Sequence, residues 1–318
     1  MTMEASYQGV ILAAGKGSRM QPFSEHWPKP LLPVLGKPLM VYQLEMLVSL
    51  GVRDVVVVIG HLGQEIVRAL GDGSRYGVKI RYVEQGEVLG IAHAVGKLEP
   101  HLDRPFFLFL GDIYFATANF AAMVEPLRQG RAQAVLACKR EPDIAAMRRN
   151  FAVMVGAVGY VARVIVKPTY PRTDLKGCGI YLFDLEFFDA VRRTPRTALR
   201  NEYEITDSIQ LFVEAGHKVM PAEVVVEDVN VSYPADLLAL NLQLLRESGA
   251  ANWCAPGARI AASAKLEHVV AMDGAAIGAG ASLRECLLFP GAEVPAGHTA
   301  RRSIFIPGSE LRCDGAAD

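Results

Sequence analysis

Short apolar runs alternate with amphipathic stretches over the first third of the chain, from Tyr7 to about Leu110. The apolar runs predict strands at residues 10–14, 54–60, 78–83 and 106–112, and the amphipathic stretches predict helices at residues 39–51, 62–70 and 91–98. The first of these helices is expected to stop at Gly51. Strands and helices in this alternation predict a mostly parallel sheet with helices on both faces.

The second half of the chain leaves another type of pairing open. Residues 152–166 have the pattern of a hairpin, so antiparallel strands of an α+β kind are the alternative for this part. The fold class predicted for the whole pattern is α/β, with a Rossmann-like, mostly parallel central sheet. Ligands bind beyond the carboxyl ends of the strands in such sheets, so the segments after Ala14 and after Leu110 are expected to carry the chemistry.

The pattern changes near residues 247–252. Beyond them, one apolar residue recurs every six positions among small residues, with a one-residue slip: Ile260, Leu266, Met272, Ile277, Leu283 and Phe289. This period predicts a short left-handed parallel β-helix of roughly 18 residues per coil, and an Ala/Gly-rich low-complexity tail is the alternative. We therefore expect one domain over residues 1–247 and a β-helix over residues 253–310. So few coils leave apolar surface to cover, which predicts a homo-oligomer, a dimer or a tetramer.

Composition excludes several kinds of partner. The 318 residues include 33 Lys or Arg and 34 Asp or Glu, and the formal net charge is −1. Such a chain has no basic field to gather nucleic acid, so any binding of phosphate must be local. The five cysteines are never spaced C-x-x-C, which argues against a disulfide framework and a structural zinc site. Without a signal peptide or an apolar run of roughly 20 residues, we expect a cytoplasmic protein with no membrane partner.

The loop after the first predicted strand, “GKGSRM” at residues 15–20, combines glycines with cations. It lacks the Walker A pattern, and Met20 stands where a dinucleotide-binding fingerprint has its third glycine. Glycines directly after a strand let backbone N–H groups approach phosphate oxygens, and Lys16 and Arg19 would supply positive charge. The loop therefore predicts an anion site, and a solvated surface turn is the alternative.

The stretch that follows carries a family resemblance. “LAAGKGSRMQP” and then “PKPLLPV” resemble the signature of the sugar-1-phosphate nucleotidylyltransferases. The similarity continues in order through “EQGEVLGIAHAV”, “FLFLGDIYF”, “VIVKP”, “GCGIYLFD”, “NEYEITDSIQLF” and “SYPADLLALN”. The pieces “LGIAHAV”, “LGD” and “EITDSIQ” are most similar to the glucose-1-phosphate thymidylyltransferase branch, and the tail resembles the short β-helix of many members.

The resemblance implies an enzyme that joins a sugar 1-phosphate to the α-phosphorus of a nucleoside triphosphate and releases pyrophosphate. The nominal pair is dTTP and glucose 1-phosphate, and UTP or GTP with another sugar 1-phosphate is the alternative. The attacking phosphate oxygen is ionised at neutral pH, so the reaction needs positioning and charge neutralisation rather than a general base. Scattered cations, backbone amides and a carboxylate-held Mg²⁺ meet that need, and the expected cofactor is Mg²⁺.

The resemblance also assigns roles to individual residues. Those expected to bind the nucleotide are Ala13, Ala14, Gly15, Gly17, Arg19, Gln85 and Gly90. Those expected to act in catalysis are Arg19, Lys29, Asp112 and Lys167. The sugar phosphate is expected at Lys167, Gly179 and Glu202, and the metal at Asp112 and Asn230. Ordinary surface side chains or turn caps are the structural alternative for Lys29, Gln85, Asp112 and Lys167.

Three departures from the family pattern concern the sugar and the metal. Val166 replaces a glutamate that would bind sugar hydroxyls, and an apolar side chain cannot make those hydrogen bonds. Ala152 adds a methyl group where a glycine would approach the sugar. Asn230 stands where relatives have a metal-binding aspartate, and Asp228 is the alternative ligand. The departures leave two rival functions open, a non-catalytic regulatory subunit and a cytidylyltransferase for a non-sugar phosphate.

Overall fold

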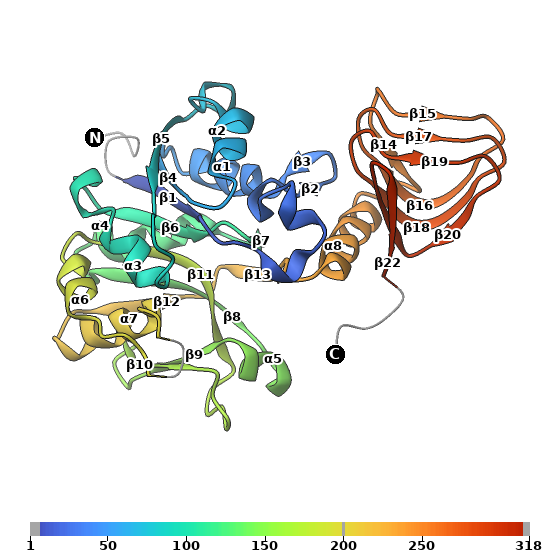
Figure 1. The fold of residues 1–318 in the computed structure, drawn as a ribbon. Helices are drawn as coiled ribbons and strands as arrows, with labels where there is room; N and C mark the ends of the chain where they lie inside the picture. Colours follow the sequence, from blue (N-terminus) through green and yellow to red (C-terminus); the bar gives the residue numbers. More distant parts are fainter. Residues whose placement is uncertain (1–6, 199–200, 314–318) are drawn as a thin grey trace. The chain divides into compact units, whose positions relative to one another are not determined.

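The computed structural model describes residues 7–198 and 201–313, which form two compact units (Figure 1). The first unit contains the described residues up to Lys16 together with Met40–Asp228. The second contains Gly17–Leu39 together with the described residues from Val229 onward. The stretch 1–247, predicted as one domain, is thus spread over both units, and its division from residues 253–310 stays a prediction.

A nine-stranded sheet forms the centre of the first unit, with a main path in the order β10-β9-β11-β6-β1-β4-β5. Its strands are β1 (Gln8–Ala13), β4 (Asp54–Ile59), β5 (Lys79–Glu84), β6 (Phe106–Leu110), β8 (Ala134–Arg140), β9 (Phe151–Val155), β10 (Val161–Val166), β11 (Leu175–Phe183) and β12 (Val219–Ala222). β1 pairs in parallel with β4 and β6, and β4 with β5. β11 is antiparallel to β6, β8 and β9, and β9 and β10 form the predicted hairpin. The α/β prediction is confirmed, and the antiparallel strands lie in the half where they were the alternative.

Helices cover both faces of this sheet. The helices of this part of the chain are α1 (Leu39–Ser49), α2 (Gly63–Leu70), α3 (Ile91–Gly96), α4 (Glu125–Arg128), α5 (Ile144–Arg149), α6 (Phe187–Arg193) and α7 (Ile205–Glu214). Neighbouring residues of a strand point to opposite faces, and Gly9 and Val10 of β1 show both. A Cβ on Gly9 would lie 2.6 Å from Leu47 of α1, so that helix packs closely on the Gly9 face. Val10 belongs to a buried cluster with Val95 of α3 and Phe187 of α6, which therefore cover the other face.

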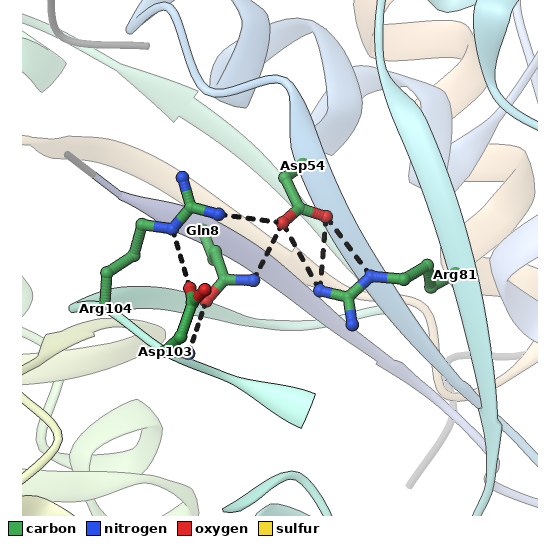
Figure 2. Close-up of polar contacts among 5 residues, drawn as sticks. All are labelled: Gln8, Asp54, Arg81, Asp103 and Arg104. Carbon is green, nitrogen blue, oxygen red and sulfur yellow. Dashed lines mark hydrogen bonds and ion pairs between the residues drawn. The ribbon is translucent and has the colours of Figure 1, made fainter. Parts of the chain in front are cut away.

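Polar contacts tie together the segments near the amino ends of the parallel strands (Figure 2). Asp54, at the start of β4, accepts a hydrogen bond from Gln8 at 2.8 Å and pairs with Arg81 and Arg104 at 3.3 and 3.2 Å. Arg104 also pairs with Asp103 at 2.9 Å. This network lies at the opposite end of the strands from the edge where a ligand is expected.

A buried side chain holds the turn after β6. Gln43 of α1 is 1% exposed, and its amide donates to the carbonyl oxygens of Leu110 and Ile113, both at 2.8 Å. These carbonyls flank the turn that carries Asp112. A separate two-stranded sheet pairs β7 (Ile113–Thr117) with β13 (Val225–Asn230). The position of Asp112 is therefore fixed from both sides of its turn.

In the second unit, the segment 17–39 lies against the C-terminal strands. The elements before those strands are η2 (Ser18–Met20), η3 (Phe23–Glu25), η4 (Lys29–Leu31), β2 (Pro33–Val34), β3 (Lys37–Pro38) and α8 (Pro234–Glu247). Asn241 of α8 is fully buried, accepts a hydrogen bond from the Leu35 N–H at 2.9 Å and donates to the Pro33 carbonyl at 3.0 Å. The rings of Phe23 and Trp27 pack on Phe289, with centroids 5.0 and 5.2 Å away.

All but the last of the C-terminal strands stack in parallel with a regular offset (Figure 1). The C-terminal strands are β14 (Trp253–Cys254), β15 (Arg259–Ile260), β16 (Lys265–Ala271), β17 (Ala276–Ile277), β18 (Ser282–Leu288), β19 (Glu293–Val294), β20 (Thr299–Arg301), β21 (Ser303–Ile306) and β22 (Ser309–Arg312). Lys265 pairs with Ser282 and Ser282 with Thr299, so one coil takes 17 residues. The predicted coil of 18 is one residue too long, because the step from Met272 to Ile277 is five residues rather than six.

Two of the predicted apolar positions, Ile277 and Leu283, lie in the core of these coils and are 3% and 1% exposed. Phe289 is fully buried against Phe23 and Trp27 instead, and Ile260 on the first coil is 38% exposed. β22 runs antiparallel to β21 and ends the stack, which the six-residue period did not predict. The strand arrangement agrees with a short parallel β-helix, and its left hand stays a prediction.

Candidate functional site

Small residues line the carboxyl end of β1 in the first unit. Ala13 and Ala14 are buried, and Gly15 is exposed with no atom within 4 Å of a Cβ built on it. A Cβ on Gly60, after β4, would lie 2.8 Å from the Ala14 carbonyl oxygen, and one on Gly111, after β6, would lie 2.6 Å from the Leu12 carbonyl oxygen of β1. At this edge the backbone therefore carries few side chains beyond Cβ, which close approach of a phosphate to its N–H groups requires.

In the continuation of this loop, which belongs to the second unit, the side chain of Lys29 packs against Gly17. Gly17 has φ +63° and a Cβ there would come 3.0 Å from the Cγ of Lys29, which is 8% exposed. Arg19 is exposed, and its guanidinium lies 5.4 Å from the centre of the Tyr233 ring and 3.5 Å from the Ser232 hydroxyl. The buried stem of Lys29 is held in place by packing, whereas Arg19 rests on an aromatic ring at the surface.

The two residues expected at the nucleobase follow β5 and precede α3. Gln85 is 5% exposed, its N–H donates to the Ile59 carbonyl at 2.9 Å, and among the described residues its side-chain amide makes no hydrogen bond. Gly90 has φ +109°, and a Cβ there would lie 2.5 Å from the Tyr203 carbonyl oxygen. That same carbonyl accepts a hydrogen bond from the Ala92 N–H at 2.9 Å. The glycine is thus required by the backbone packing, and the Gln85 amide is available to a ligand.

The lysine expected at the sugar phosphate has an unusual backbone. Lys167 follows β10, is exposed, and has φ +46°, with its N–H donating to the Asn150 carbonyl at 2.7 Å. A residue before a proline, here Pro168, rarely adopts positive φ, and such backbone often marks a functional position. Val166 beside it is 37% exposed, so the residue that replaces the family glutamate is not buried.

Gly179 and Glu202, the other two residues expected at the sugar phosphate, lie on different elements. Gly179 is buried in β11 with φ +76°, at the irregularity between Gly177 and Tyr181. A Cβ on Gly177 would overlap the Phe151 ring, at 1.9 Å. Glu202 is half-buried in the loop before α7, and its carbonyl accepts the Thr197 N–H at 2.9 Å. This loop and β11 belong to the first unit, as does Lys167.

The candidate metal ligands are two oxygen donors. Asp112 is half-buried in the first unit, and Asn230 is exposed in the second, where its Oδ1 accepts a hydrogen bond from the Ser232 hydroxyl at 3.2 Å. A carboxylate and an amide oxygen suit a hard cation such as Mg²⁺, which takes most of its remaining ligands from water and phosphate. Within the described residues no group of three or more His, Cys, Asp or Glu side chains could hold a metal ion.

Asp228, the alternative ligand, is already engaged by two lysines. Its Oδ1 lies 2.8 Å from the Lys176 Nζ and 3.2 Å from the Lys139 Nζ, and Lys139 also pairs with Glu141 at 3.2 Å. We call Lys139, Glu141, Lys176 and Asp228 the charged quartet. Because Asp228 is held by these partners, Asn230 is the better candidate for the metal. No sequence motif predicts the quartet, and a lone lysine inside the apolar β11 was the one available signal.

Burial and the charges of the quartet shift the pKa values of Lys139 and Cys178. Burial alone would lower the pKa of Lys139, but the Asp228 charge and hydrogen bonds to Asp228 and Glu141 raise that pKa on balance. Burial, and next the Asp228 charge, raise the pKa of the Cys178 thiol well above its usual value. Lys139 therefore stays charged at neutral pH, whereas Cys178 stays a neutral thiol.

The sequence profile of the nucleotidyl transferase family matches residues 8–229. The chain belongs to the nucleotidyl transferase family. The matched region holds the loop after β1, the turn with Asp112 and all the described residues of the first unit after Tyr7. No helix among the described residues is long and apolar enough to cross a membrane.

Named members of the nucleotidyl transferase family are similar over most of this chain. One is the UTP–glucose-1-phosphate uridylyltransferase AglF of Haloferax volcanii, 35% identical over 72% of this chain and 93% of the relative. A glucose-1-phosphate thymidylyltransferase of Streptomyces griseus is 37% identical over 67% of this chain and 59% of its own. A crystal structure of a Bacillus anthracis protein described as a glucose-1-phosphate thymidylyltransferase, with bound sucrose, superposes with a TM-score of 0.67. This chain and the Bacillus anthracis protein are 25% identical in sequence, and the superposition covers 76% of this chain and 96% of the Bacillus anthracis chain.

Proposed function

We propose that this protein transfers a nucleotidyl group from a nucleoside triphosphate to a sugar 1-phosphate and releases pyrophosphate. The observation that carries the proposal is its similarity to AglF over 93% of that enzyme's length. The nominal substrates are dTTP and glucose 1-phosphate. UTP has equal support, because similar relatives are named for uridylyl and for thymidylyl transfer.

The chemistry of the two units supports this reaction. An ionised phosphate oxygen needs no base, so the protein has to place the reactants and neutralise charge on the phosphates. The bare backbone around Gly15 would accommodate the triphosphate, and Lys29 and Arg19 would supply positive charge. Lys167 would hold the sugar phosphate from a fixed backbone position. These are the kinds of groups that stabilise charge in a phosphoryl-transfer transition state.

The base would be bound at Gln85 and Gly90. Because its amide makes no hydrogen bond among the described residues, Gln85 can donate to and accept from the edge of a pyrimidine. Thymine and uracil present the same edge to an amide, which is why dTTP and UTP both remain candidates. The positive φ of Gly90 brings backbone close to the same region without a side chain.

Enzymes of this family generally work with a divalent metal, and we propose Mg²⁺ with Asp112 and Asn230 as protein ligands. When bound, the cation would neutralise charge on the phosphate oxygens and lower the barrier to attack. The chain's own contribution is to hold Asp112 in its turn through the two hydrogen bonds from Gln43. Ser232 orients the Asn230 amide oxygen.

We also propose a homo-oligomer, a dimer or a tetramer. Ile260, on the first coil of the C-terminal strands, is 38% exposed, and a second copy would cover such apolar surface. Light scattering on the purified protein tests this part independently of activity, and a monomer at micromolar concentration would contradict it.

Pyrophosphate release in the presence of Mg²⁺ tests the reaction. The assay crosses dTTP, UTP, GTP, CTP and ATP with a panel of sugar 1-phosphates and with phosphocholine. Release with dTTP or UTP and a sugar 1-phosphate supports the proposal. Release with phosphocholine alone overturns it in favour of a cytidylyltransferase-like activity. Silence from folded protein that binds a nucleotide favours a regulatory subunit.

A further inference from the structure

A nearly buried lysine lies in the middle of the first unit. Lys176 is 4% exposed, and among the described residues the Oδ1 of Asp228, at 2.8 Å, is the one acceptor within reach of its ammonium group. An ammonium group carries three N–H donors, so two of them lack a protein partner. A buried donor without an acceptor is costly, and such a group calls for further oxygen atoms.

Lys139 provides the contrast within the same quartet. Its ammonium group lies 3.2 Å from Asp228 and 3.2 Å from Glu141, and its side chain is 17% exposed. It therefore has two carboxylates and access to water. Both lysines contact the same oxygen of Asp228, but Lys176 alone combines near-complete burial with unused donors.

The register of the sheet places Lys176 among residues expected on the acceptor side. It lies opposite Ala152 of β9 and opposite Lys139 of β8. Ala152 is the position where a family glycine would approach the sugar, and Gly179 lies three residues further along β11. Val166 of β10 pairs with Phe151 rather than with Ala152, so its side chain faces the other side of the sheet from Lys176. Lys176 therefore shares its face with Ala152, the position where the family glycine would approach the sugar.

We propose that Lys176 is a specificity-determining residue whose ammonium group donates a hydrogen bond to a ring hydroxyl of the acceptor sugar, with Asp228 holding it in place. The two lysines and two carboxylates of the quartet sum to zero charge. This favours a neutral hydroxyl over a carboxylate or a second phosphate on the sugar. The inference rests on the proposed function, and it names the acceptor as a sugar 1-phosphate recognised through a hydroxyl.

The first test compares Lys176→Met with Lys139→Met. Each variant removes one ion pair from the same Asp228 oxygen, so a purely structural role predicts similar losses. We expect Lys176→Met to raise KM for the sugar 1-phosphate about 10- to 100-fold, as for loss of a charge-assisted hydrogen bond, and to leave KM for the nucleotide within about twofold. Lys139→Met is expected to change the sugar KM by less than about threefold, and Lys176→Arg to recover part of the loss. Equal effects of the two Met variants on the sugar KM would overturn the proposal.

The second test uses monodeoxy derivatives of the best sugar 1-phosphate, and its wild-type measurement does not depend on the folding of a variant. Wild-type enzyme should discriminate against one derivative by about tenfold or more in kcat/KM, and Lys176→Met should lose most of that discrimination. Wild-type enzyme that accepts all the derivatives equally would overturn the inference and leave the proposed function intact. Wild-type protein that neither turns over nor binds any sugar 1-phosphate would overturn both.

Discussion

The stem of Lys29 lies along Gly17, so closely that a Cβ on Gly17 would come 3.0 Å from the Lys29 Cγ. Gly17 also has φ +63°, which costs a residue with a side chain about 1–2 kcal/mol. Gly17→Ala should therefore lower the free energy of unfolding by about that amount and displace Lys29, with a higher KM for the nucleotide. Urea unfolding and steady-state kinetics measure the two effects.

Gly15→Ala is the matched comparison for the same loop. A Cβ on Gly15 meets no atom within 4 Å, so the methyl group should leave the free energy of unfolding unchanged. If the triphosphate lies on this backbone, the methyl group will still raise the KM for the nucleotide about tenfold or more, because a phosphate can no longer approach. An unchanged nucleotide KM in Gly15→Ala would show that the triphosphate binds elsewhere.

Asp112→Asn should nearly abolish turnover with Mg²⁺. The change removes the one carboxylate among the two proposed metal ligands, and a loss of several kcal/mol of charge stabilisation corresponds to about a thousandfold in kcat. Gln43→Met should give a smaller loss of kcat, because it frees the turn without removing the ligand. Pyrophosphate release across a Mg²⁺ titration compares the variants, and calorimetric titration of Mn²⁺ reports metal binding directly. Substantial residual turnover in Asp112→Asn would count against its role.

Lys167→Ala should act mainly on the acceptor. Loss of a cation from the sugar phosphate is expected to raise the KM for the sugar 1-phosphate about tenfold or more, with little change in the KM for the nucleotide. Lys79→Ala serves as the control, because that lysine is also exposed and lies at the amino end of β5. If the two variants have the same kinetics, Lys167 is an ordinary surface lysine.

Local pattern was enough to predict the longer strands and helices between Gln8 and Leu110, but not the short elements of residues 18–38, and it identified several buried positions of the C-terminal coils. Each of these elements has its own periodicity, so Ile277, Leu283 and Phe289 could be identified from spacing alone. The coil length was wrong by one residue because the five-residue step after Met272 was counted as a slip rather than as part of each coil.

Contacts between distant segments could not be read in the same way. Lys176 of β11 and Asp228 of β13 are separated along the chain by α6, α7 and β12, and only the folded sheet brings them together. The Gln43 amide was visible as a polar residue in an apolar helix, but its acceptors on Leu110 and Ile113 depend on the packing of α1. The grouping of residues 17–39 with the C-terminal part likewise follows from aromatic packing on Phe289.

Asp54→Ala should destabilise the first unit without changing its chemistry. The change leaves Arg81 and Arg104, both partly buried, without their shared carboxylate, at a cost of about 1–3 kcal/mol. Asp103→Ala removes one more exposed ion pair to Arg104 and should cost less than about 1 kcal/mol. Urea unfolding compares the two variants, and both should keep the wild-type KM values because this network lies away from the carboxyl edge of the sheet. Equal losses of stability would show that the shared carboxylate is not the anchor we infer.

Acidification should weaken the packing of α3 through His93. Burial, and next the Lys97 charge, lower the pKa of His93 below its usual value of 6.5, against a smaller opposing effect of Glu87. The folded state therefore binds this proton less tightly than the unfolded chain does. The contribution of neutral His93 to stability is fully present above pH 6.5 and is lost as the pH falls through the lower folded pKa.

His93→Phe separates the ring from its charge. The imidazole stacks on Tyr203 with centroids 6.0 Å apart, and a phenyl ring preserves that contact without a titrating group. The melting temperature of the wild type should fall between about pH 7.5 and about pH 5 by more than the melting temperature of His93→Phe does. Because the Tyr203 carbonyl also holds Ala92 beside Gly90, the nucleotide KM of the wild type should rise with the same pH dependence. Parallel pH profiles for wild type and His93→Phe would rule out His93 as the source of the acid sensitivity.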